Sequence, residues 1–202
     1  MAAMPRPVLR TERIELRPLT MEHLPLLVDL DADPEVLRHI LGRARTEAEA
    51  CDFWGPICGD AYADHLGLGF WVGFALGTED FLGWWDVSPA RGDLYDEAGR
   101  PIVPVRAEAG WRLRREFWRA GLASEGAAAL FAHGFAVGLE VIWAETMAVN
   151  LASRGVMRRL GMRHVRTDVR SWPNPLPGAA EGEVIYEMPR EEWLRRRGRI
   201  EP

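Results

Sequence analysis

The sequence predicts an α/β (α+β) fold, in which strands and helices follow one another along the chain. Three segments predict it. Residues 11–19 alternate polar and apolar side chains, which is the pattern of a half-buried strand. Residues 69–87 hold two runs of aromatic and β-branched residues around a Gly-Thr-Glu-Asp turn. Residues 105–139 read as an apolar strand, a glycine-containing turn and an alanine-rich helix.

The N-terminal part is expected to hold one strand and three helices. Pro18 closes the strand, and Thr20 is the expected N-cap of the helix that follows. That helix turns three leucines inward: Leu24, Leu27 and Leu30. Asp33-Pro34 indicates the start of a second, short helix, and residues 46–61 indicate a third.

An antiparallel hairpin is expected next, with strands over Gly69–Ala75 and Phe81–Val87. Its tryptophans leave two interpretations open. They pack in the core, or they form one wall of a substrate pocket, for which the candidates are Trp71, Trp84 and Trp85. The segment Ser88–Pro104 is rich in proline, glycine and aspartate and is expected to be a loop.

The C-terminal half is expected to contain three more strands after the central one, and two helices. The expected elements are a strand over Val105–Leu113, a helix over 121–139, a strand over Val141–Met147, a short helix after Asn150, and a strand pair over Arg163–Ser171 and Glu183–Met188. Asn150 is the expected cap of the short helix and Gly161 its end. The arginine-rich tail, RRRGRIEP, is expected to be solvated.

Composition is that of an ordinary soluble globular chain of 202 residues, of which 48% are hydrophobic. One domain is expected over residues 1–202, with its core over about 8–193 and flexible ends. The net charge of -5 argues against a general nucleic-acid binder, and no apolar run approaches the roughly 20 residues that span a bilayer. Cys51 and Cys58 are too few for a disulfide scaffold and lack partners for a zinc site. A cytoplasmic location without a bound metal is expected.

The central turn, within residues 107–128, predicts an anion site. A strand that feeds a turn and then a helix leaves unpaired N–H groups at the helix start, and the helix dipole favours negative charge there. Four arginines surround this turn: Arg112, Arg114, Arg115 and Arg119. A ligand that carries phosphates is therefore expected. The turn lacks the patterns of a phosphate-binding NTPase and of a dinucleotide fold, and taken alone it also fits an ordinary strand–helix connection.

Four segments together carry a family resemblance: TERIELRPLT, AEAGWRLRREFWRAGLASEG, NLASRGVMRRLGM and VIYEMPREEW. In this order and spacing, from Thr11 to Trp193, the chain resembles the GNAT N-acetyltransferase superfamily. Within it, the chain is most similar to the RimJ/RimL branch, which acetylates protein N-termini and assorted small amines. The resemblance implies a mixed, mostly antiparallel central sheet flanked by helices, with two splayed parallel central strands.

The pyrophosphate loop of that family follows the pattern Gln/Arg-x-x-Gly-x-Gly/Ala. The corresponding residues here are Trp118, Arg119, Ala120, Gly121, Leu122 and Ala123. Gly121 and Ala123 keep the last two anchors, while Trp118 replaces the leading residue. Arg119 and Ala120 stand where the branch usually has a glycine and a basic residue. Because backbone N–H groups bind the phosphates, these changes are expected to do less harm than loss of Gly121 would.

The resemblance implies acetyl-CoA as co-substrate, bound where the strands Val105–Leu113 and Val141–Met147 splay. The pantetheine arm would lie along the first strand and the pyrophosphate on the loop. The implied cofactor-binding residues are Trp111, Arg112, Leu113, Trp118, Arg119, Ala120, Gly121, Leu122, Ala123, Ser124 and Asn150. The family pattern also lets the N–H near Trp111 polarise the thioester carbonyl.

In this family an amine attacks the thioester directly, so a general base is the key residue. Glu108 is the candidate, because it lies on the central strand where the family often has a carboxylate. The alternative for Glu108 is a structural, salt-bridged carboxylate. An α-amine titrates near 8 and a lysine amine near 10.4, so a single carboxylate is better matched to an α-amine or a similarly weak base.

Two polar residues near the short helix complete the implied site. Asn150 would bind the pantetheine arm, and its role as N-cap is compatible with this. Many GNAT enzymes place a tyrosine on this helix to protonate the leaving thiolate, but Val156 and Met157 occupy the corresponding positions. Ser153 is the substitute candidate, against the alternative of a simple first-turn hydroxyl.

The acceptor amine stays open between a protein N-terminus, a polyamine, an antibiotic and a small metabolite, and the acyl group need not be acetyl. The acidic composition favours a cationic acceptor, whereas the aromatic hairpin favours an apolar one. Because members of this family often form homodimers, the resemblance also implies a homodimer, formed through the hairpin or the final strands. An alternative of another class is a GNAT-like module that binds acyl-CoA without transferring it. Amine-dependent release of CoA separates the two.

Overall fold

The computed structural model describes residues 5–59, 67–89 and 105–197. Its helices are α1 (Leu24–Asp31), α2 (Glu47–Cys58), α3 (Leu122–Ala136), α4 (Leu151–Leu160) and α5 (Arg190–Arg197). Its strands are β1 (Leu9–Arg10), β2 (Ile14–Pro18), β3 (Gly69–Ala75), β4 (Phe81–Ser88), β5 (Arg106–Leu113), β6 (Val141–Met147), β7 (Arg163–Asp168) and β8 (Glu183–Pro189). Short 3-10 turns precede α1 and α3 and lie between β7 and β8.

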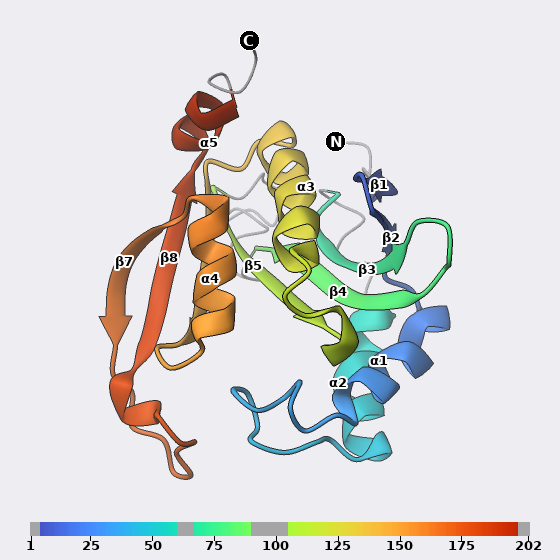
Figure 1. Cartoon of the computed structure of the whole chain (residues 1–202), viewed down its shortest axis with the longest axis vertical. Coiled ribbons are helices and arrows are strands. Elements are labelled where there is room, and N and C mark those ends of the chain that lie inside the picture. The colour runs from blue at the N-terminus through green and yellow to red at the C-terminus, as the bar shows by residue number, and fades with distance from the viewer. Residues whose placement is uncertain (1–4, 60–66, 90–104, 198–202) are drawn as a thin grey trace, which may run out of the picture.

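The strands form one mixed sheet in the order β1-β2-β3-β4-β5-β6-β8-β7 (Figure 1). All neighbouring strands are antiparallel except β5 and β6, which are parallel. The helix α3 forms the crossover between these two, as a parallel pair requires. The predicted mixed, mostly antiparallel sheet with one central parallel pair is confirmed.

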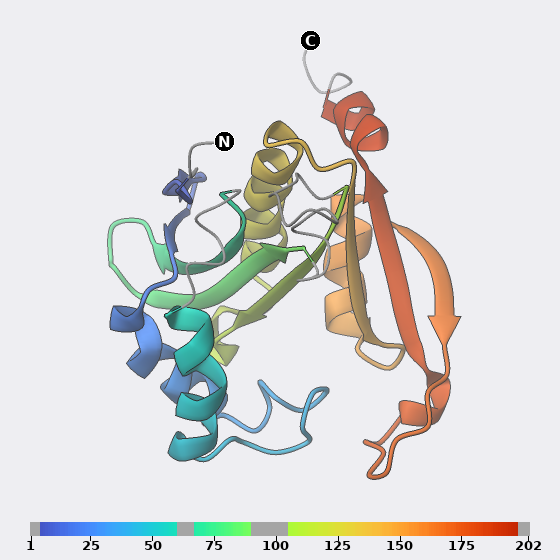
Figure 2. The ribbon, with the colours of Figure 1, turned by 180° about the vertical axis from the view of Figure 1, so that it is seen from behind.

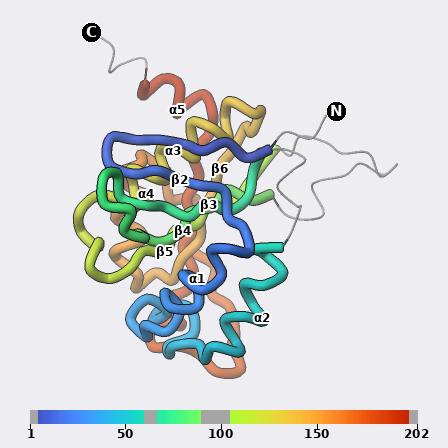
Figure 3. Tube along the Cα trace, turned by 90° about the vertical axis from the view of Figure 1, so that its right-hand side faces the viewer, coloured from blue at the N-terminus to red at the C-terminus, as the bar shows by residue number. Residues whose placement is uncertain are grey.

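Helices cover both faces of the sheet. The face toward the viewer in Figure 1 packs against α3 and α4, and the same core includes Trp85 of β4 and Ile142 of β6. The other face, seen in Figure 2, packs against α1 and α2. Figure 3 shows these two helices together below strands β2 to β5. There Leu27 and Trp54 contact a second core that includes Val72 and Trp84. We call this second face the α1–α2 face.

Local signals explain most of the element boundaries. Thr46 caps α2 with the reciprocal capping box that it forms with Glu49. Asn150 caps α4 through its side-chain oxygen, and Gly161 ends that helix in the left-handed region. The hairpin strands β3 and β4 lie where the aromatic runs predicted them. None of the described helices is long and apolar enough to cross a membrane.

One prediction about the elements was wrong. The short helix expected from Asp33-Pro34 is a series of turns, because Asp33 accepts only local bonds and no helical ladder continues. Arg195–Arg197, at the start of the arginine-rich tail, are exposed as expected, and they also form the end of the helix α5, which was not predicted. Trp193 holds that helix on the core, with its ring 5.8 Å from that of Phe131. The expected loop over Ser88–Pro104 lies mostly outside the described residues, and Ser88 itself ends β4.

A methyl group added at Gly126 on α3 is expected to destabilise the protein. It would lie 2.6 Å from the Trp85 ring, which is fully buried and is fixed by a 3.0 Å bond from its Nε1 to the Ala123 carbonyl. Overpacking should lower the free energy of unfolding of Gly126→Ala by about 1–3 kcal/mol. The control is Gly155→Ala on α4, where no atom lies within 4 Å of the new methyl group. That variant should gain up to about 1 kcal/mol of helix propensity. Urea unfolding measures both, and stabilisation by both substitutions would contradict this packing.

Candidate active site

The parallel strands β5 and β6 pair over a short stretch only. The paired positions run from Arg106 opposite Val141 to Glu108 opposite Trp143, although β5 continues to Leu113 and β6 to Met147. Beyond Glu108 and Trp143, within the described chain, the two strands have separated. This separation lies at the start of the family's expected cofactor site and leaves the β6 side of β5 without a ladder partner.

The backbone of β5 presents alternate residues to this opening. The Arg114 N–H donates to the Leu82 carbonyl of β4 at 2.9 Å, and such bonds recur at every second residue of an antiparallel pair. The N–H groups of Arg112 and Gly110 therefore face β4, and those of Trp111 and Leu113 face the opening. Of the three strand residues expected to bind the pantetheine arm through their backbone, Arg112 is thus turned away from the opening. Its side chain enters the α1–α2 face, where it donates to Asp31.

The predicted loop leads from the end of β5 to the start of α3. Trp118 is partly exposed, and its indole N–H donates to the Leu113 carbonyl at 2.8 Å, which ties the loop to the edge of the opening. Arg119 (φ 61°) and Gly121 (φ 81°) both have left-handed backbones. A side chain is strained at such a φ, which explains why a glycine suits the position of Arg119. Gly121 precedes the first turn of α3, whose N–H groups lie at Leu122, Ala123 and Ser124.

Two arginines that the sequence did not single out lie beside this turn. A Cβ atom on Gly121 would lie 3.0 Å from Arg159 Nη1 and 3.5 Å from Arg13 Nη2. Arg13 is occupied, because it donates to the Ala120 carbonyl and pairs with Glu125 on α3. Arg159 is exposed, and its side chain has no hydrogen bond or ion pair within the described chain. The turn at Gly121 is therefore positively charged, as an anion site requires.

Glu108 lies at the point where β5 and β6 part. It is opposite Trp143 on β6 and opposite Ser88 on β4. Its side chain keeps contact with solvent, yet the surrounding protein desolvates it enough to raise its pKa. The nearby Glu145 carboxylate raises the pKa further, and Arg170 partly offsets both effects. A carboxylate with a raised pKa at this position has the properties of a general base.

Glu145 and Arg170 form the polar border of this region. Arg170 donates to Glu145 at 2.5 and 2.8 Å, and Glu145 is the next residue after Trp143 on the same face of β6. The charge of Glu145 therefore stays near Glu108 but is largely neutralised.

A second carboxylate, that of Asp86, was not found from the sequence. Asp86 is on β4, it is 8% exposed, and it lies opposite Gly110 on the α1–α2 face. Burial raises its pKa from an ordinary 3.8 to about 7. The Glu108 charge also raises it, whereas the Ser88 hydroxyl, the Gly110 N–H and Arg112 lower it. A single aspartate in an aromatic strand does not by itself indicate a buried carboxylate with a raised pKa.

The remaining predicted residues lie at different places. Asn150 uses its side-chain oxygen to accept from the Ser153 N–H at 3.2 Å, and its amide group donates to Thr146 at 2.9 Å. Ser153 is on the first turn of α4 and is half-buried. Trp71 and Trp85 are fully buried in the core on the α3 side, so the core-packing interpretation fits them. Trp84 lies on the α1–α2 face, where Arg112 contacts its ring.

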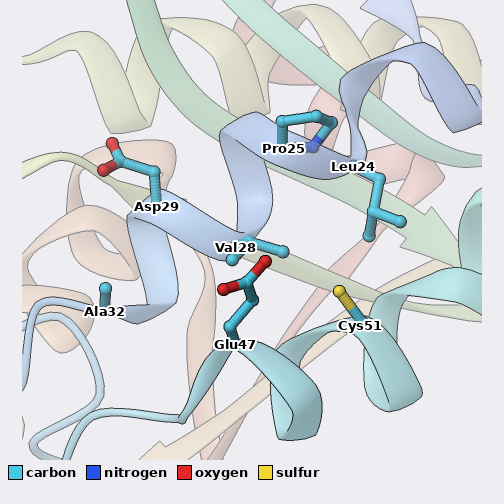
Figure 4. A pocket seen from close by; sticks show the side chains of 7 residues that line it. All are labelled: Leu24, Pro25, Val28, Asp29, Ala32, Glu47 and Cys51. Carbon is cyan, nitrogen blue, oxygen red and sulfur yellow. The ribbon is translucent and has the colours of Figure 1, made fainter.

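A groove also lies between α1 and α2 (Figure 4). It is lined by Leu24, Pro25, Val28, Asp29, Ala32, Glu47 and Cys51. None of the predicted site residues lines it. No group of three or more histidine, cysteine or acidic side chains in the described residues could hold a metal ion.

Comparisons with known proteins bear on the family to which this chain belongs. The sequence model of the acetyltransferase (GNAT) domain matches residues 13–163. A relative from Aspergillus fumigatus, named FsC-acetyl coenzyme A-N(2)-transacetylase, is 41% identical over 194 residues, which cover 94% of this chain and 79% of the relative.

Solved structures of acetyltransferases share the fold. A GNAT-family acetyltransferase from Bacillus anthracis superposes with a TM-score of 0.72 at 21% identity, over 92% of this chain and all of that one. RimL, a ribosomal L7/L12 α-N-protein acetyltransferase in complex with coenzyme A, superposes with a TM-score of 0.69 at 16% identity, over 92% of this chain and 99% of that one. At these identities the structures show the fold alone. The domain match and the 41% identical transacetylase show more: the chain belongs to the GNAT acetyltransferase family and is an N-acetyltransferase.

Proposed function

We propose that this enzyme transfers the acetyl group of acetyl-CoA to a primary amine, with Glu108 as the general base. The separation of β5 and β6 directly after Glu108 carries the proposal. It puts a carboxylate of raised pKa beside the only stretch of β5 whose amides lack a strand partner in the described chain. Acetyl-CoA supplies an activated acyl thioester.

The residues present fit acetyl-CoA. The N–H groups of Trp111 and Leu113 face the opening and can bind the amide groups of a pantetheine arm. The amides at the start of α3, with the Arg159 guanidinium beside them, can bind a pyrophosphate. Asn150 keeps one amide hydrogen beyond those bonded in the structure, which is available to the arm.

The chemistry requires proton transfer from the acceptor. An amine enters mostly as the ammonium ion near neutral pH, and only the neutral form attacks a carbonyl. Glu108 takes the proton, and the Trp111 N–H polarises the thioester carbonyl. Ser153, at the first turn of α4, is proposed to donate a hydrogen bond to the leaving thiolate.

For the acceptor we propose an α-amine type of nitrogen. The Aspergillus fumigatus relative is named for transfer to a nitrogen numbered 2, and RimL for transfer to a protein α-nitrogen. The Glu108 carboxylate, at the point where β5 and β6 part, favours a cationic acceptor.

A panel of amines tests this function. CoA release is followed with a thiol reagent, using acetyl-CoA and a tripeptide with a free N-terminus, spermidine or kanamycin. We expect CoA release that depends on at least one amine and yields its N-acetyl product by mass spectrometry, fastest with the tripeptide. Tight acetyl-CoA binding without turnover of any amine would favour a binding module. Absence of acetyl-CoA binding would contradict the site.

Replacement of Arg159 is expected to weaken acetyl-CoA binding. The free guanidinium beside Gly121 can pair with a phosphate oxygen, and a charge-assisted bond of this kind contributes about 1.5–3 kcal/mol. Arg159→Ala should raise the KM for acetyl-CoA by roughly tenfold with little change in kcat, and the effect should shrink in high salt. Arg158→Ala, the exposed neighbour on α4, is the control. Equal KM values for the two variants would remove Arg159 from the site.

We propose that the protein forms a homodimer through its final strands. The hairpin aromatics Trp71 and Trp85 are fully buried and cannot form a dimer surface. The edge strand β7 exposes Val165 and leaves one side of its backbone unpaired in the described chain. Light scattering of the wild type and of Val165→Lys tests this, and a dimer that persists in the variant would exclude this edge.

A further inference from the structure

Two polar side chains of β4 face the candidate active site and have no role in the reaction described above. Asp86 and Ser88 are two residues apart, so both lie on the α1–α2 face of the sheet. Ser88 is directly opposite Glu108, and Asp86 is directly opposite Gly110. The Ser88 side chain therefore neighbours Glu108 across the strand pair and Asp86 along β4.

The carboxylate of Asp86 is held over the backbone of β5. A Cβ atom on Gly110 would lie 2.4 Å from Asp86 Oδ1, so only a glycine leaves room for this carboxylate. Gly110 comes two residues after Glu108, where β5 and β6 have just parted. Asp86 thus lies at the level at which the opening begins, although it is 8% exposed.

The Ser88 hydroxyl is available between the two acids. Its Oγ is buried and has no hydrogen-bond partner within the described chain, and the hydroxyl is near enough to Asp86 to lower the pKa of that carboxyl. Burying a hydroxyl group without a hydrogen-bond partner costs free energy. A role in proton transfer would give this hydroxyl a function, because it can both donate and accept a hydrogen bond.

The reaction needs a place for two protons. An acceptor that enters as an ammonium ion loses one proton before it attacks and a second as its nitrogen bonds to the acyl carbon. The leaving CoA sulfur takes up one of them. Glu108 alone can hold one proton at a time, so it must pass the first one on before it accepts the second.

We propose that Ser88 and Asp86 form a proton relay for Glu108, in which Asp86 receives the first proton of the ammonium ion. Protonated Glu108 donates to Ser88 Oγ while the Ser88 hydroxyl passes its own proton to Asp86 Oδ. Glu108 is again a carboxylate, Ser88 is unchanged and Asp86 is a neutral acid. The proton later returns to solvent along the same path. Ser88 and Asp86 act through Glu108 and are positioning residues. This inference rests on the proposed function of Glu108.

The surroundings of Asp86 suit a proton acceptor. Burial and the Glu108 charge raise its pKa to about 7, so it can take up a proton near neutral pH. The charged groups that face it are Glu108 and Arg112 of β5, and Arg112 is in turn paired with Asp31 of α1. The β3 neighbour is Phe70, and the ring of Trp54 on α2 contacts both Phe70 and Trp84. This apolar packing favours the neutral, protonated form of Asp86 over its carboxylate.

The test compares Asp86→Asn, Ser88→Ala and Ser88→Thr, assayed with the tripeptide. We expect Asp86→Asn and Ser88→Ala to lower kcat at least fivefold near pH 7, with the KM for acetyl-CoA unchanged. Ser88→Thr keeps the hydroxyl and should retain most of the rate. The deficits should shrink above about pH 8, where an α-amine enters neutral and loses only one proton. Combined with Glu108→Gln, Asp86→Asn should cause no additional loss.

Several outcomes would overturn the relay. These are a wild-type rate for Asp86→Asn near pH 7, a deficit that is equal at all pH values, or losses that multiply with that of Glu108→Gln. If Glu108→Gln itself keeps the wild-type rate, the base assignment fails with it. Loss in Glu108→Gln but not in Asp86→Asn overturns the relay alone.

A measurement without an acceptor separates the relay from misfolding. In ¹³C NMR titrations of the side-chain carboxyls, Asp86 should titrate far above an ordinary aspartate, and Glu108→Gln should lower its pKa, because the Glu108 charge raises it. A pKa raised by folding means that wild-type stability falls as pH rises from about 4 to about 7. Asp86→Asn should therefore melt at a higher temperature than wild type at about pH 8 and lose this advantage at about pH 4. An ordinary pKa for Asp86 would overturn the proposal.

Discussion

Glu108→Gln is expected to lower kcat by a factor of about 10²–10⁴, the usual contribution of a general base, and by no less than tenfold. The amide keeps the size of the side chain opposite Ser88 and Trp143 but cannot accept a proton. The KM for acetyl-CoA should be unchanged, because the arm and phosphates are proposed to bind through other groups. Steady-state CoA release with the tripeptide measures both constants.

The control for this variant is Glu187→Gln. Glu187 lies on β8 opposite Trp143 and pairs with Arg106, so it is a carboxylate of the same sheet outside the opening. Its replacement should leave kcat within about twofold of wild type, as an exposed ion pair contributes little. Equal rates for Glu108→Gln and Glu187→Gln would show that Glu108 is a structural carboxylate.

The pH dependence has a definite sign. A base must be deprotonated to act, so kcat should fall as pH drops through the pKa of Glu108, which lies above its ordinary value of 4.5. Glu145→Gln removes a charge that raises this pKa, and the acidic limb should then move to lower pH. A limb that moves to higher pH would contradict the assignment.

Asp31→Asn is expected to cause the largest loss of stability among the substitutions considered. Asp31 is fully buried on α1, where it pairs with Arg45 and Arg112 and accepts from the Trp54 indole at 2.9 Å. Its loss leaves two largely buried guanidinium groups without a counter-charge. Breaking a buried pair by removing one partner costs about 3–5 kcal/mol.

Asp29→Asn on the same helix is the matched control. Asp29 pairs with Arg114, but its side chain is 62% exposed, and a surface pair of this kind contributes about 0–1 kcal/mol. Urea denaturation of both variants measures the difference. Similar small losses for both would mean that the Asp31 network does not fasten α1 to β5.

The sequence predicted those parts of the fold that have local causes. The capping box at Thr46 and the end of α4 at Gly161 follow from a few adjacent residues. The strand–turn–helix around Gly121 was likewise visible, because its glycine, its apolar strand and its alanine-rich helix are consecutive. The helix α5 was missed, since its arginines hide an amphipathic pattern that depends on Trp193 alone.

The parts that were missed depend on register between distant strands. Asp86 approaches Glu108 only because β4 and β5 pair with Asp86 opposite Gly110. Adjacent tryptophans at 84 and 85 face opposite sides of the sheet, and their sequence does not say which side each takes. Arg159 reaches Gly121 only after α3 and α4 pack on one face. These contacts join side chains from separate elements, so no local sequence pattern predicts them.

The most direct test of the account is an amide NMR titration of the ¹⁵N-labelled wild type with CoA. We expect large shifts at Trp111 and Leu113, which face the opening, and over residues 119–124, which lead into the first turn of α3. The amides of Gly110 and Arg112, which face β4, should shift less. Shifts confined to other residues, such as those that line the α1–α2 groove, would contradict the proposal that acetyl-CoA binds where β5 and β6 separate.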